Sequence, residues 1–369
     1  MGSTIIGCGK SLPKLEVAND DLKALVDTND EWISSRTGIR TRHVAVEETA
    51  TDLAEAAARQ ALGLDAGGWC EGSAVDPSTI DLVIFATITP DVTVPSAAGL
   101  LRRRLGLEHA IAFDLNAACT GFVYGLTVAE CMMAGSAAGA PGAAGRNPIR
   151  RALVVGAERL TRVTNWSDRN TCVLFGDGAG AAVLEWDESR PGIMSSFITN
   201  ADDDTNALTC AFAIDAPIPF SADGVTPERV EDAALAHVDQ ELNIAELVEA
   251  GEPRQVLRMD GPKVFKFAAE AMTTAVHVAL DRAGVSLDDV ACIVPHQANE
   301  RIIKYAAKKL GRPLDFFQLS IGHTGNTSAA SLPMALSDAY ADGRIKRGDK
   351  VVLVAFGGGF TSGAVLIEA

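Results

Sequence analysis

A cysteine, a histidine and an asparagine occur in three short segments whose surroundings could make them reactive. Cys119 lies where an apolar run, residues 110–115, gives way to a segment of small residues. If that segment begins a helix, its unpaired N–H groups and positive end would favour the thiolate of Cys119, the form that attacks carbonyl carbons. A single cysteine is more often a small buried side chain, so this interpretation depends on the other two residues.

His296 follows an apolar run in the segment 295–299, Pro-His-Gln-Ala-Asn, and Asn326 opens a second segment of small residues. Open α/β sheets usually place ligand groups at the carboxyl ends of their parallel strands. A lone histidine in this setting is as often structural as functional. Several polar side chains beside an apolar strand are costly to bury, however, unless something polar lies between them. We therefore expect Cys119, His296 and Asn326 to meet in one pocket.

The expected helices and strands follow the same order in two halves of the chain. The first half has a helix at 51–62, a strand at 80–87, a helix ending at Arg104, a strand at 110–115, the Cys119 helix, and strands at 152–156 and 176–184. The second half has a helix at 264–283, a strand at 290–296, a helix ending at Lys309, and then the segments 316–319, 325–331, 350–356 and 362–367. Such alternation predicts an α/β fold with mostly parallel sheets, here as two similar halves packed together. This pairing places Cys119 and Asn326 at corresponding positions.

We divide the chain into an N-terminal half carrying the cysteine (1–186), a linking segment with an acidic insertion (187–258), and a C-terminal half carrying histidine and asparagine (259–369). The Gly/Ala-rich stretch 134–148 is expected to be a surface loop. The insertion, 202–258, is expected to contain a helix near 230–244. It could cap a substrate site or merely decorate an edge.

Composition limits the class of protein. A chain of 369 residues, 47% hydrophobic, can bury a large core. The formal net charge of −16 opposes nucleic-acid binding. Seven cysteines without paired spacing favour a reducing compartment and no metal site. We find no apolar segment long and uncharged enough to span a bilayer and expect a soluble, cytoplasmic protein that does not bind membranes.

The segments around the three residues resemble the catalytic segments of 3-oxoacyl-[acyl-carrier-protein] synthase III, the family of initiating condensing enzymes of bacterial fatty-acid synthesis. The resemblance extends over nearly the whole chain in the right order. Its segments are 30–40, 116–122, 175–181, 294–299, 325–331 and 356–361. It implies a thiolase-like fold of two pseudo-symmetric halves in a five-layered αβαβα sandwich, a homodimer, and a Cys-His-Asn triad.

The resemblance also implies a reaction. Cys119 would take a short acyl group from acyl-CoA as a thioester and then condense it with malonyl-acyl carrier protein, giving 3-oxoacyl-carrier protein, coenzyme A and carbon dioxide. His296 and Asn326 would donate hydrogen bonds to the enolate, provided that the histidine presents a protonated nitrogen. The N–H groups of Cys119 and Gly358 would form the oxyanion hole. No cofactor and no metal are expected, because the coenzyme A thioester is a substrate.

Substrate contacts are implied in the same way. Trp32 and Arg169 would sandwich the adenine of coenzyme A, with Arg36 and Thr37 nearby; either aromatic or arginine could otherwise be ordinary packing or surface charge. Val94 matches a position that limits the acyl pocket in the family. Since valine is small, we expect tolerance of acyl groups longer than acetyl or branched.

Docking of the carrier protein is implied for one basic helix and a neighbouring lysine. The residues concerned are Lys266, Arg301, Lys304, Lys308 and Lys309. From spacing alone, this is the solvated face of an amphipathic helix. An acidic chain that meets an acidic partner nevertheless needs a local basic patch, which favours docking.

Two residues depart from the family pattern, since Ser362 replaces a usual tryptophan and Pro262 an asparagine that often contacts pantetheine. They keep open an alternative function, a related condensing or acyl-transferring enzyme of a specialised pathway. A third hypothesis is a thioesterase or a non-catalytic acyl-binding protein. An intact triad argues against it, because binding needs no activated thiol and hydrolysis has no evident use for an enolate-stabilising pair.

Overall fold

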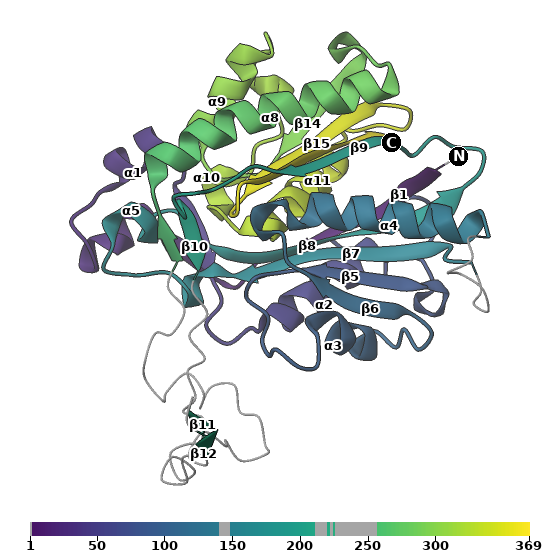
Figure 1. Ribbon diagram of the computed structural model, residues 1–369, viewed down its shortest axis with the longest axis horizontal. Helices are drawn as coiled ribbons and strands as arrows, with labels where there is room; N and C mark the ends of the chain where they lie inside the picture. The colour runs from purple at the N-terminus through teal and green to yellow at the C-terminus, as the bar shows by residue number, and fades with distance from the viewer. Residues whose placement is uncertain (1, 140–147, 211–219, 222–223, 226–256) are drawn as a thin grey trace.

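The computed structural model describes residues 2–139, 148–210, 220–221, 224–225 and 257–369. Two sheets and three layers of helices alternate in them (Figure 1). Helices α8 and α9 cover the outer face of one sheet, α2 and α3 cover the outer face of the other, and α4 and α11 lie between the sheets. This is the expected αβαβα sandwich. The helix expected near 230–244 and most of the acidic insertion lie outside the described residues.

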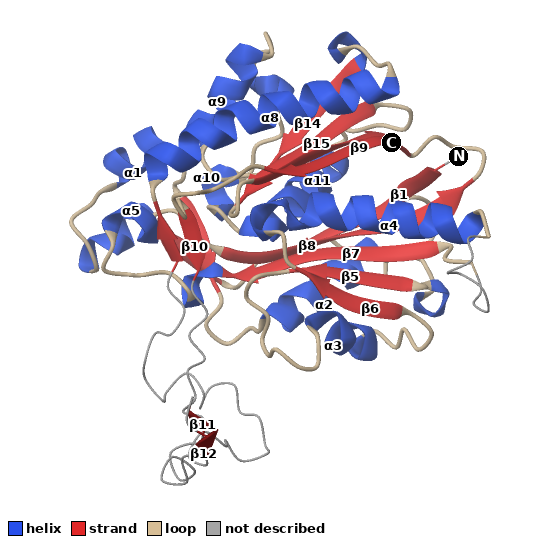
Figure 2. Ribbon diagram, viewed as in Figure 1, coloured by secondary structure: helices blue, strands red, loops and turns tan. Residues whose placement is uncertain are grey.

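The N-terminal sheet has the order β4-β1-β8-β7-β5-β6 (Figure 2). Its strands are β1 (Gly2–Ser11), β4 (Trp69–Cys70), β5 (Leu82–Ala86), β6 (Ile111–Leu115), β7 (Arg151–Arg159) and β8 (Asp177–Asp187). β5 runs parallel to β6 and β7, whereas β8 is antiparallel to both β1 and β7. The sheet is therefore mixed rather than mostly parallel.

The C-terminal sheet has the order β14-β15-β16-β9. Its strands are β9 (Ile193–Asn200), β14 (Val290–Pro295), β15 (Lys350–Gly357) and β16 (Thr361–Glu368). Only β14 and β15 are parallel, because the short connection between β15 and β16 can join only antiparallel neighbours. β9 belongs to the segment that we expected to be a linker, so the second half of the fold begins before residue 259.

The helices of the sandwich match the expected helical segments. They are α2 (Ala50–Ala61), α3 (Ala97–Arg104), α4 (Gly121–Ala137), α8 (Gly261–Ala283), α9 (Glu300–Lys309) and α11 (Ser331–Ala341). α2 lies very close to the sheet because its inner face is alanine-rich and meets glycines of β1. A Cβ at Gly7 would lie 1.9 Å from the Ala61 carbonyl oxygen, so only glycine allows this approach.

Shorter elements cluster at one end of the sandwich. The helices are α1 (Asp30–Thr37), α5 (Arg169–Cys172) and α10 (Ile321–Thr324). The strands pair as β2 (Leu15–Ala18) with β3 (Thr41–Val44) and β10 (Leu208–Cys210) with β13 (Leu257–Met259). A further pair, β11 (Phe220–Ser221) with β12 (Gly224–Val225), is not part of this group. A separate apolar cluster holds this end together.

The central helix α4 is mostly apolar, and its core residues pack against both sheets in one continuous cluster. Contrary to our expectation, the helical segment 118–137 is apolar and long enough to cross a membrane by length and composition. In the fold it is a core helix between two sheets. All seven cysteines are unpaired, in agreement with the expected thiol state.

The pseudo-symmetry of the halves differs by a few residues from the predicted pairing. The turn η3 (Ala118–Thr120) leads into α4, as η9 (Ser328–Ala330) leads into α11. Ala118 and Ser328 both have left-handed backbones, with φ of 45° and 49°. Asn326 therefore corresponds to Asn116, and Cys119 corresponds to Ala329. The predicted equivalence of Cys119 and Asn326 was wrong, because the position that corresponds to Cys119 lies three residues after Asn326.

Candidate active site

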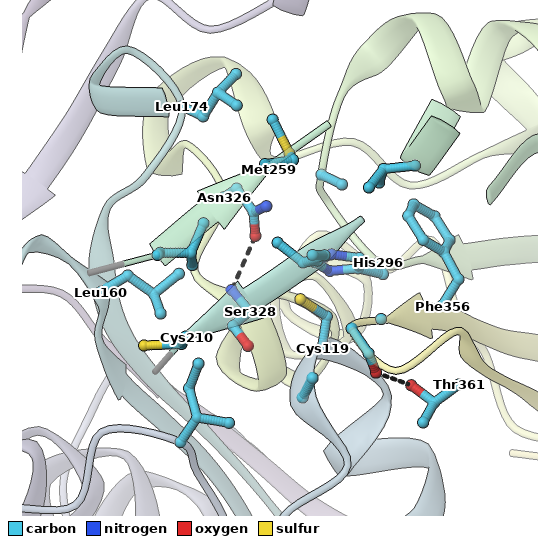
Figure 3. Close-up of a pocket in the computed structure, with 18 of the residues that line it drawn as sticks. Cys119, Leu160, Leu174, Cys210, Met259, His296, Asn326, Ser328, Phe356 and Thr361 are labelled. Atoms are coloured by element: carbon cyan, nitrogen blue, oxygen red, sulfur yellow. Dashed lines mark hydrogen bonds between the residues drawn. The ribbon is translucent and has the colours of Figure 1, made fainter. Parts of the chain in front are cut away.

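A cavity of about 480 Å³ lies between the halves and is lined by Cys119, His296 and Asn326 (Figure 3). The turn before α4 places the cysteine, the end of β14 places the histidine, and the segment before η9 places the asparagine. Three residues far apart in the sequence thus share one pocket, as the sequence analysis expected.

Cys119 lies at the start of a helix, but its thiol is not held as a thiolate. Burial raises the pKa of Cys119 to about 12, more than the Ser328 hydroxyl and the backbone N–H lower it. The expected benefit of the helix end is therefore outweighed, and the thiol is protonated near neutral pH. Attack on a carbonyl requires a base that removes the proton as the bond forms.

His296 can be that base, because its hydrogen bonds determine which ring nitrogen carries a proton. The Ser331 hydroxyl donates to the Ser328 carbonyl at 2.9 Å and accepts from the Gln297 N–H at 3.2 Å. Because the Ser331 proton is already used, His296 Nδ1–H must be the donor in the 2.6 Å hydrogen bond between Nδ1 and the Ser331 oxygen. Nε2 keeps its lone pair, is buried, and has no hydrogen-bond partner within the described segments.

Burial also keeps the imidazole neutral, since it lowers the pKa of His296 to about 3. The Phe356 ring packs edge-on against the imidazole, with centroids 5.2 Å apart. The condition that the histidine presents a protonated nitrogen to an enolate is not met in this resting tautomer. Nε2 becomes a donor only after it has accepted a proton.

Asn326 is held so that its amide nitrogen is available to the cavity. Its Oδ1 accepts the Ser328 N–H at 2.9 Å (Figure 3), and its backbone N–H donates to the Leu174 carbonyl at 2.9 Å. A third bond runs from the Gly176 N–H to the Asn326 carbonyl at 3.0 Å. The backbone and Oδ1 are thus fixed by both halves, and Nδ2 remains to donate to a substrate oxygen.

The triple glycine at 357–359 closes the cavity beside Cys119, and all three glycines line it. A Cβ at Gly357 would lie 2.7 Å from the Cys119 backbone nitrogen and 3.0 Å from Thr361 Oγ1. Glycine therefore lets this chain segment approach the nucleophile. The arrangement is compatible with the predicted oxyanion hole from the N–H groups of Cys119 and Gly358, which remains a prediction.

The sequence analysis missed several residues of the site. Ser328 and Cys210 line the cavity, Ser331 holds the histidine, and Glu158 lies buried beside Cys119. The rest of the wall is mostly apolar; it includes Ile88, Leu160, Leu174, Leu208, Leu257 and Met259. The apolar wall residues come from segments without a polar motif, so only the fold identifies them.

The four residues predicted to bind coenzyme A lie outside the lining of this cavity. Arg169 and Arg36 both stack on the Trp32 ring, 3.9 and 4.7 Å from its centroid. The space that an adenine would need between Trp32 and Arg169 is therefore closed. Thr37 is buried and its hydroxyl donates to the Ile33 carbonyl, which contradicts a direct contact with coenzyme A.

The acyl-pocket role of Val94 stays a prediction. Val94 is 83% exposed and does not line the cavity of its own chain. It lies in the loop after β5, whereas the wall is built from the segments around β10, β13 and the end of β7.

The two residues that depart from the family pattern have local explanations. Pro262 occupies the first turn of α8, where a missing N–H costs no hydrogen bond. Ser362 is buried in β16, opposite Phe356 and Thr199. Both are accommodated by the fold.

The predicted docking residues are all exposed and lie on two neighbouring helices. Arg301, Lys304, Lys308 and Lys309 are exposed on α9, and Lys266 is exposed on the adjacent α8. Lys304 pairs with Glu300 at 3.1 Å, and Lys309 lies 5.6 Å above the Tyr305 ring. The apolar side of α9, including Ile302 and Ile303, is buried. The structure thus confirms the amphipathic helix, while docking stays a prediction.

A duplicated α/β sandwich with a cysteine, a histidine and an asparagine around one cavity defines an acyl-transferring enzyme of the thiolase fold. Sequence comparison agrees: profiles described as "3-Oxoacyl-[acyl-carrier-protein (ACP)] synthase III" and its "C terminal" part match residues 113–202 and 280–369. The beta-ketoacyl-[acyl-carrier-protein] synthases III of Alkalilimnicola ehrlichii and Clostridium beijerinckii are 44% and 41% identical, over 99% of this chain and 98% of each relative. The crystal structure of the synthase III from Aquifex aeolicus superimposes with a TM-score of 0.80 at 36% identity, covering both chains fully. The chain belongs to the 3-oxoacyl-[acyl-carrier-protein] synthase III family.

Proposed function

We propose that this enzyme catalyses the initiating condensation of fatty-acid synthesis, in which a short acyl-CoA and malonyl-acyl carrier protein give 3-oxoacyl-carrier protein, coenzyme A and carbon dioxide. The observation that carries the proposal is the common cavity of Cys119, His296 and Asn326 in a chain of this family. The specialised-pathway alternative is not favoured, since the local structure accommodates Ser362 and Pro262.

In the first half-reaction Cys119 attacks the acyl-CoA carbonyl. His296 Nε2 accepts the thiol proton, because Nδ1 already donates to Ser331 and a neutral imidazole is a competent base. The N–H groups of Cys119 and Gly358 face the developing oxyanion. Coenzyme A leaves with the proton, and the acyl group stays on sulfur.

In the second half-reaction malonyl-carrier protein loses carbon dioxide and forms a thioester enolate. Asn326 Nδ2 is the donor that the resting site already offers to the enolate oxygen, because Oδ1 is occupied by the Ser328 N–H. The enolate carbon then attacks the acyl-Cys119 carbonyl, and the same oxyanion hole stabilises the second tetrahedral intermediate.

Coenzyme A entry requires the Trp32 stack to open. Arg169 covers the indole at 3.9 Å, whereas a base stacked between the two groups needs roughly twice that separation. We propose that adenine displaces Arg169 and then lies between it and Trp32, with Arg36 nearby. Tryptophan fluorescence titrated with coenzyme A tests this; an unchanged signal would contradict it.

We propose that the acyl carrier protein docks on the basic face of α9 and Lys266, which suits an acidic partner in an enzyme of net charge −16. We further propose a cytoplasmic homodimer. β6 is the outer strand of the N-terminal sheet in the described structure, and an uncovered edge strand favours pairing with a second copy. Light scattering after size exclusion tests the dimer, and a monomer at micromolar concentration would contradict it.

The assay that tests the function combines radiolabelled acyl-CoA with malonyl-carrier protein over a range of acyl lengths. A 3-oxoacyl product supports the proposal, whereas free acid alone would indicate hydrolysis. The apolar wall leads us to expect use of acyl groups longer than acetyl or branched. Cys119→Ser serves as the control for covalent acylation, read by mass spectrometry.

A further inference from the structure

Glu158 is a carboxyl group that these reaction steps leave unused, although it is fully buried beside the active site. Its Oε2 accepts hydrogen bonds from the hydroxyls of Thr89 at 2.5 Å and Thr87 at 3.2 Å, and the Ile88 N–H donates to it at 3.1 Å. Both threonine hydroxyls accept backbone N–H bonds, from Arg159 and Thr89 respectively. Their own protons therefore point at Glu158.

The Ser328 hydroxyl connects this carboxyl to the nucleophile. It lies within hydrogen-bonding reach of both the Glu158 carboxyl and the Cys119 thiol, and Ser328 stands next to Cys119 in the cavity (Figure 3). Its oxygen is buried and has no assigned hydrogen-bond partner among the described residues, so the hydroxyl is free to turn toward either group. A hydroxyl both donates and accepts, so it can pass a proton between two flanking groups.

The condensation half-reaction consumes one proton. In acylation, the proton of Cys119 can leave on the sulfur of coenzyme A. In condensation, the electron pair of the broken malonyl bond makes the new carbon–carbon bond, and the acyl carbon–sulfur bond breaks with its pair on Cys119. Because burial raises the pKa of this thiol to about 12, the sulfur must be reprotonated before the next cycle.

His296 is a poor source of that proton, because the imidazole is neutral and its one proton is held by Ser331. We propose that Glu158 supplies it: as the carbon–sulfur bond breaks, Ser328 gives its hydroxyl proton to the Cys119 sulfur and takes a replacement from the Glu158 carboxyl. Glu158 is left as a carboxylate and regains a proton from solvent after the product departs. The inference rests on the proposed condensing function.

The electrostatics of the buried carboxyl suit this role. Burial raises the pKa of Glu158 to about 7, in spite of the hydrogen bonds that favour its ionised form. The titratable groups that face it are the thiols of Cys119 on η3 and Cys210 on β10. A carboxyl of this acidity is partly protonated at neutral pH and gives its proton readily to a far more basic thiolate.

The experiment separates the two half-reactions in Glu158→Gln, which keeps the size of the side chain and removes its titration. We expect formation of the acyl-enzyme from acyl-CoA to stay near the wild-type rate and condensation to fall by about 10²-fold. Wild-type condensation should decline as the pH rises through about 7, because only the protonated carboxyl donates. In the variant this decline should disappear.

Ser328→Ala is the second variant, and it should show the same selective loss. Alanine is accepted in this left-handed backbone, since Ala118 already occupies the corresponding position with φ of 45°. Glu130→Gln is the matched control: its carboxyl is hydrogen-bonded to Ser3 outside the cavity, so both half-reactions should be unchanged. Thermal unfolding identifies variants that fail to fold.

Equal loss of both half-reactions, or a variant that keeps the wild-type pH dependence, would overturn the inference and indicate a structural carboxyl. The proposed function is judged separately, by whether the wild-type enzyme makes a 3-oxoacyl product. A wild-type enzyme that condenses while Glu158→Gln condenses equally well would leave the function intact and remove the proton donor.

Discussion

The two halves of the fold place residues at corresponding positions beside one cavity, but the side chains differ: a threonine and a glutamate in the N-terminal half, a histidine and a phenylalanine in the C-terminal half. Thr87 is the first residue after β5, as His296 is after β14; Glu158 is one residue from the end of β7, as Phe356 is in β15. Each pair is in contact: Thr87 donates to Glu158 at 3.2 Å, and the rings of His296 and Phe356 are 5.2 Å apart.

This difference explains how a thiol, a neutral imidazole and a carboxyl coexist in one site. The N-terminal half surrounds its carboxyl with hydroxyls, whereas the C-terminal half gives its imidazole an aromatic ring and one serine. No carboxylate contacts His296 within the described structure, so burial alone sets the direction of its pKa shift, which is downward, and the ring stays neutral. Separate halves therefore allow two titratable groups to be tuned in opposite directions.

The strongest test of the comparison removes the nucleophile of one half. In the C-terminal half the position that corresponds to Cys119 is already an alanine, Ala329, so Cys119→Ala gives both halves the same residue there. We expect acyl-enzyme formation to vanish and condensation to fall by on the order of 10⁴-fold or more. Mass spectrometry and product assay measure both, and retention of a covalent acyl group would point to another nucleophile, such as Cys210.

The second test compares the two asparagines. Oδ1 of each accepts the N–H two residues later, at 2.9 Å from Ser328 for Asn326 and 3.3 Å from Ala118 for Asn116. Asn326→Ala should slow condensation by about 10³-fold through loss of an enolate donor. Asn116 is exposed, so Asn116→Ala should have a much smaller effect on kcat. Similar losses would show that the halves are not chemically distinct here.

The third test compares two glycines, one from each half, at which the backbone lies too close to a neighbouring segment for a larger side chain. A Cβ at Gly357 would crowd the Cys119 nitrogen at 2.7 Å, and a Cβ at Gly156 would crowd the Ala329 carbonyl at 2.3 Å. Gly357→Ala should lower kcat by about 10²-fold, because it displaces the nucleophile and its N–H. Gly156→Ala should mainly lower stability, by about 1–3 kcal/mol. Urea unfolding and kinetics together distinguish them; the reverse pattern would contradict the assignment.

The smallest expected effect concerns the helices that follow the corresponding strands β5 and β14. Lys308→Glu with Lys309→Glu on α9 should raise KM for malonyl-carrier protein several-fold and leave acylation by acyl-CoA unchanged. Arg103→Glu on α3 is the matched control, since this arginine is exposed on the counterpart helix. Equal effects of the two changes would indicate general charge rather than docking on α9. The comparison is made at low and high salt, because screening weakens exposed charges.

The sequence predicted the triad because each of its members carries a local signal: a small-residue turn after a strand, or a polar segment after an apolar run. It also predicted two similar halves from the repeated order of elements, and the family resemblance implied the five layers. It could not predict Glu158, because a single glutamate without a motif gains a role only from the groups that the fold places against it. It contained Ser331 within a catalytic segment, but not the hydrogen bond of this serine to His296.

Other errors have equally physical causes. β9 lies in a stretch of mixed polarity, and only pairing with β16 makes it a strand. The thiolate expectation counted the helix end but not the burial that outweighs it. The Trp32–Arg169 sandwich around adenine stays a prediction, and the stacking of these two side chains on each other could not be read from the sequence.

The central helix α4 has a consequence for whether the two halves can be separated. Its core residues, among them Phe122 and Leu126, lie in one cluster with Val294 and Leu353 of the opposite half. A fragment that ends between β8 and β9 would expose to water the apolar face of α4 that packs against the C-terminal sheet. The two halves should therefore unfold in a single cooperative transition, and neither should fold on its own.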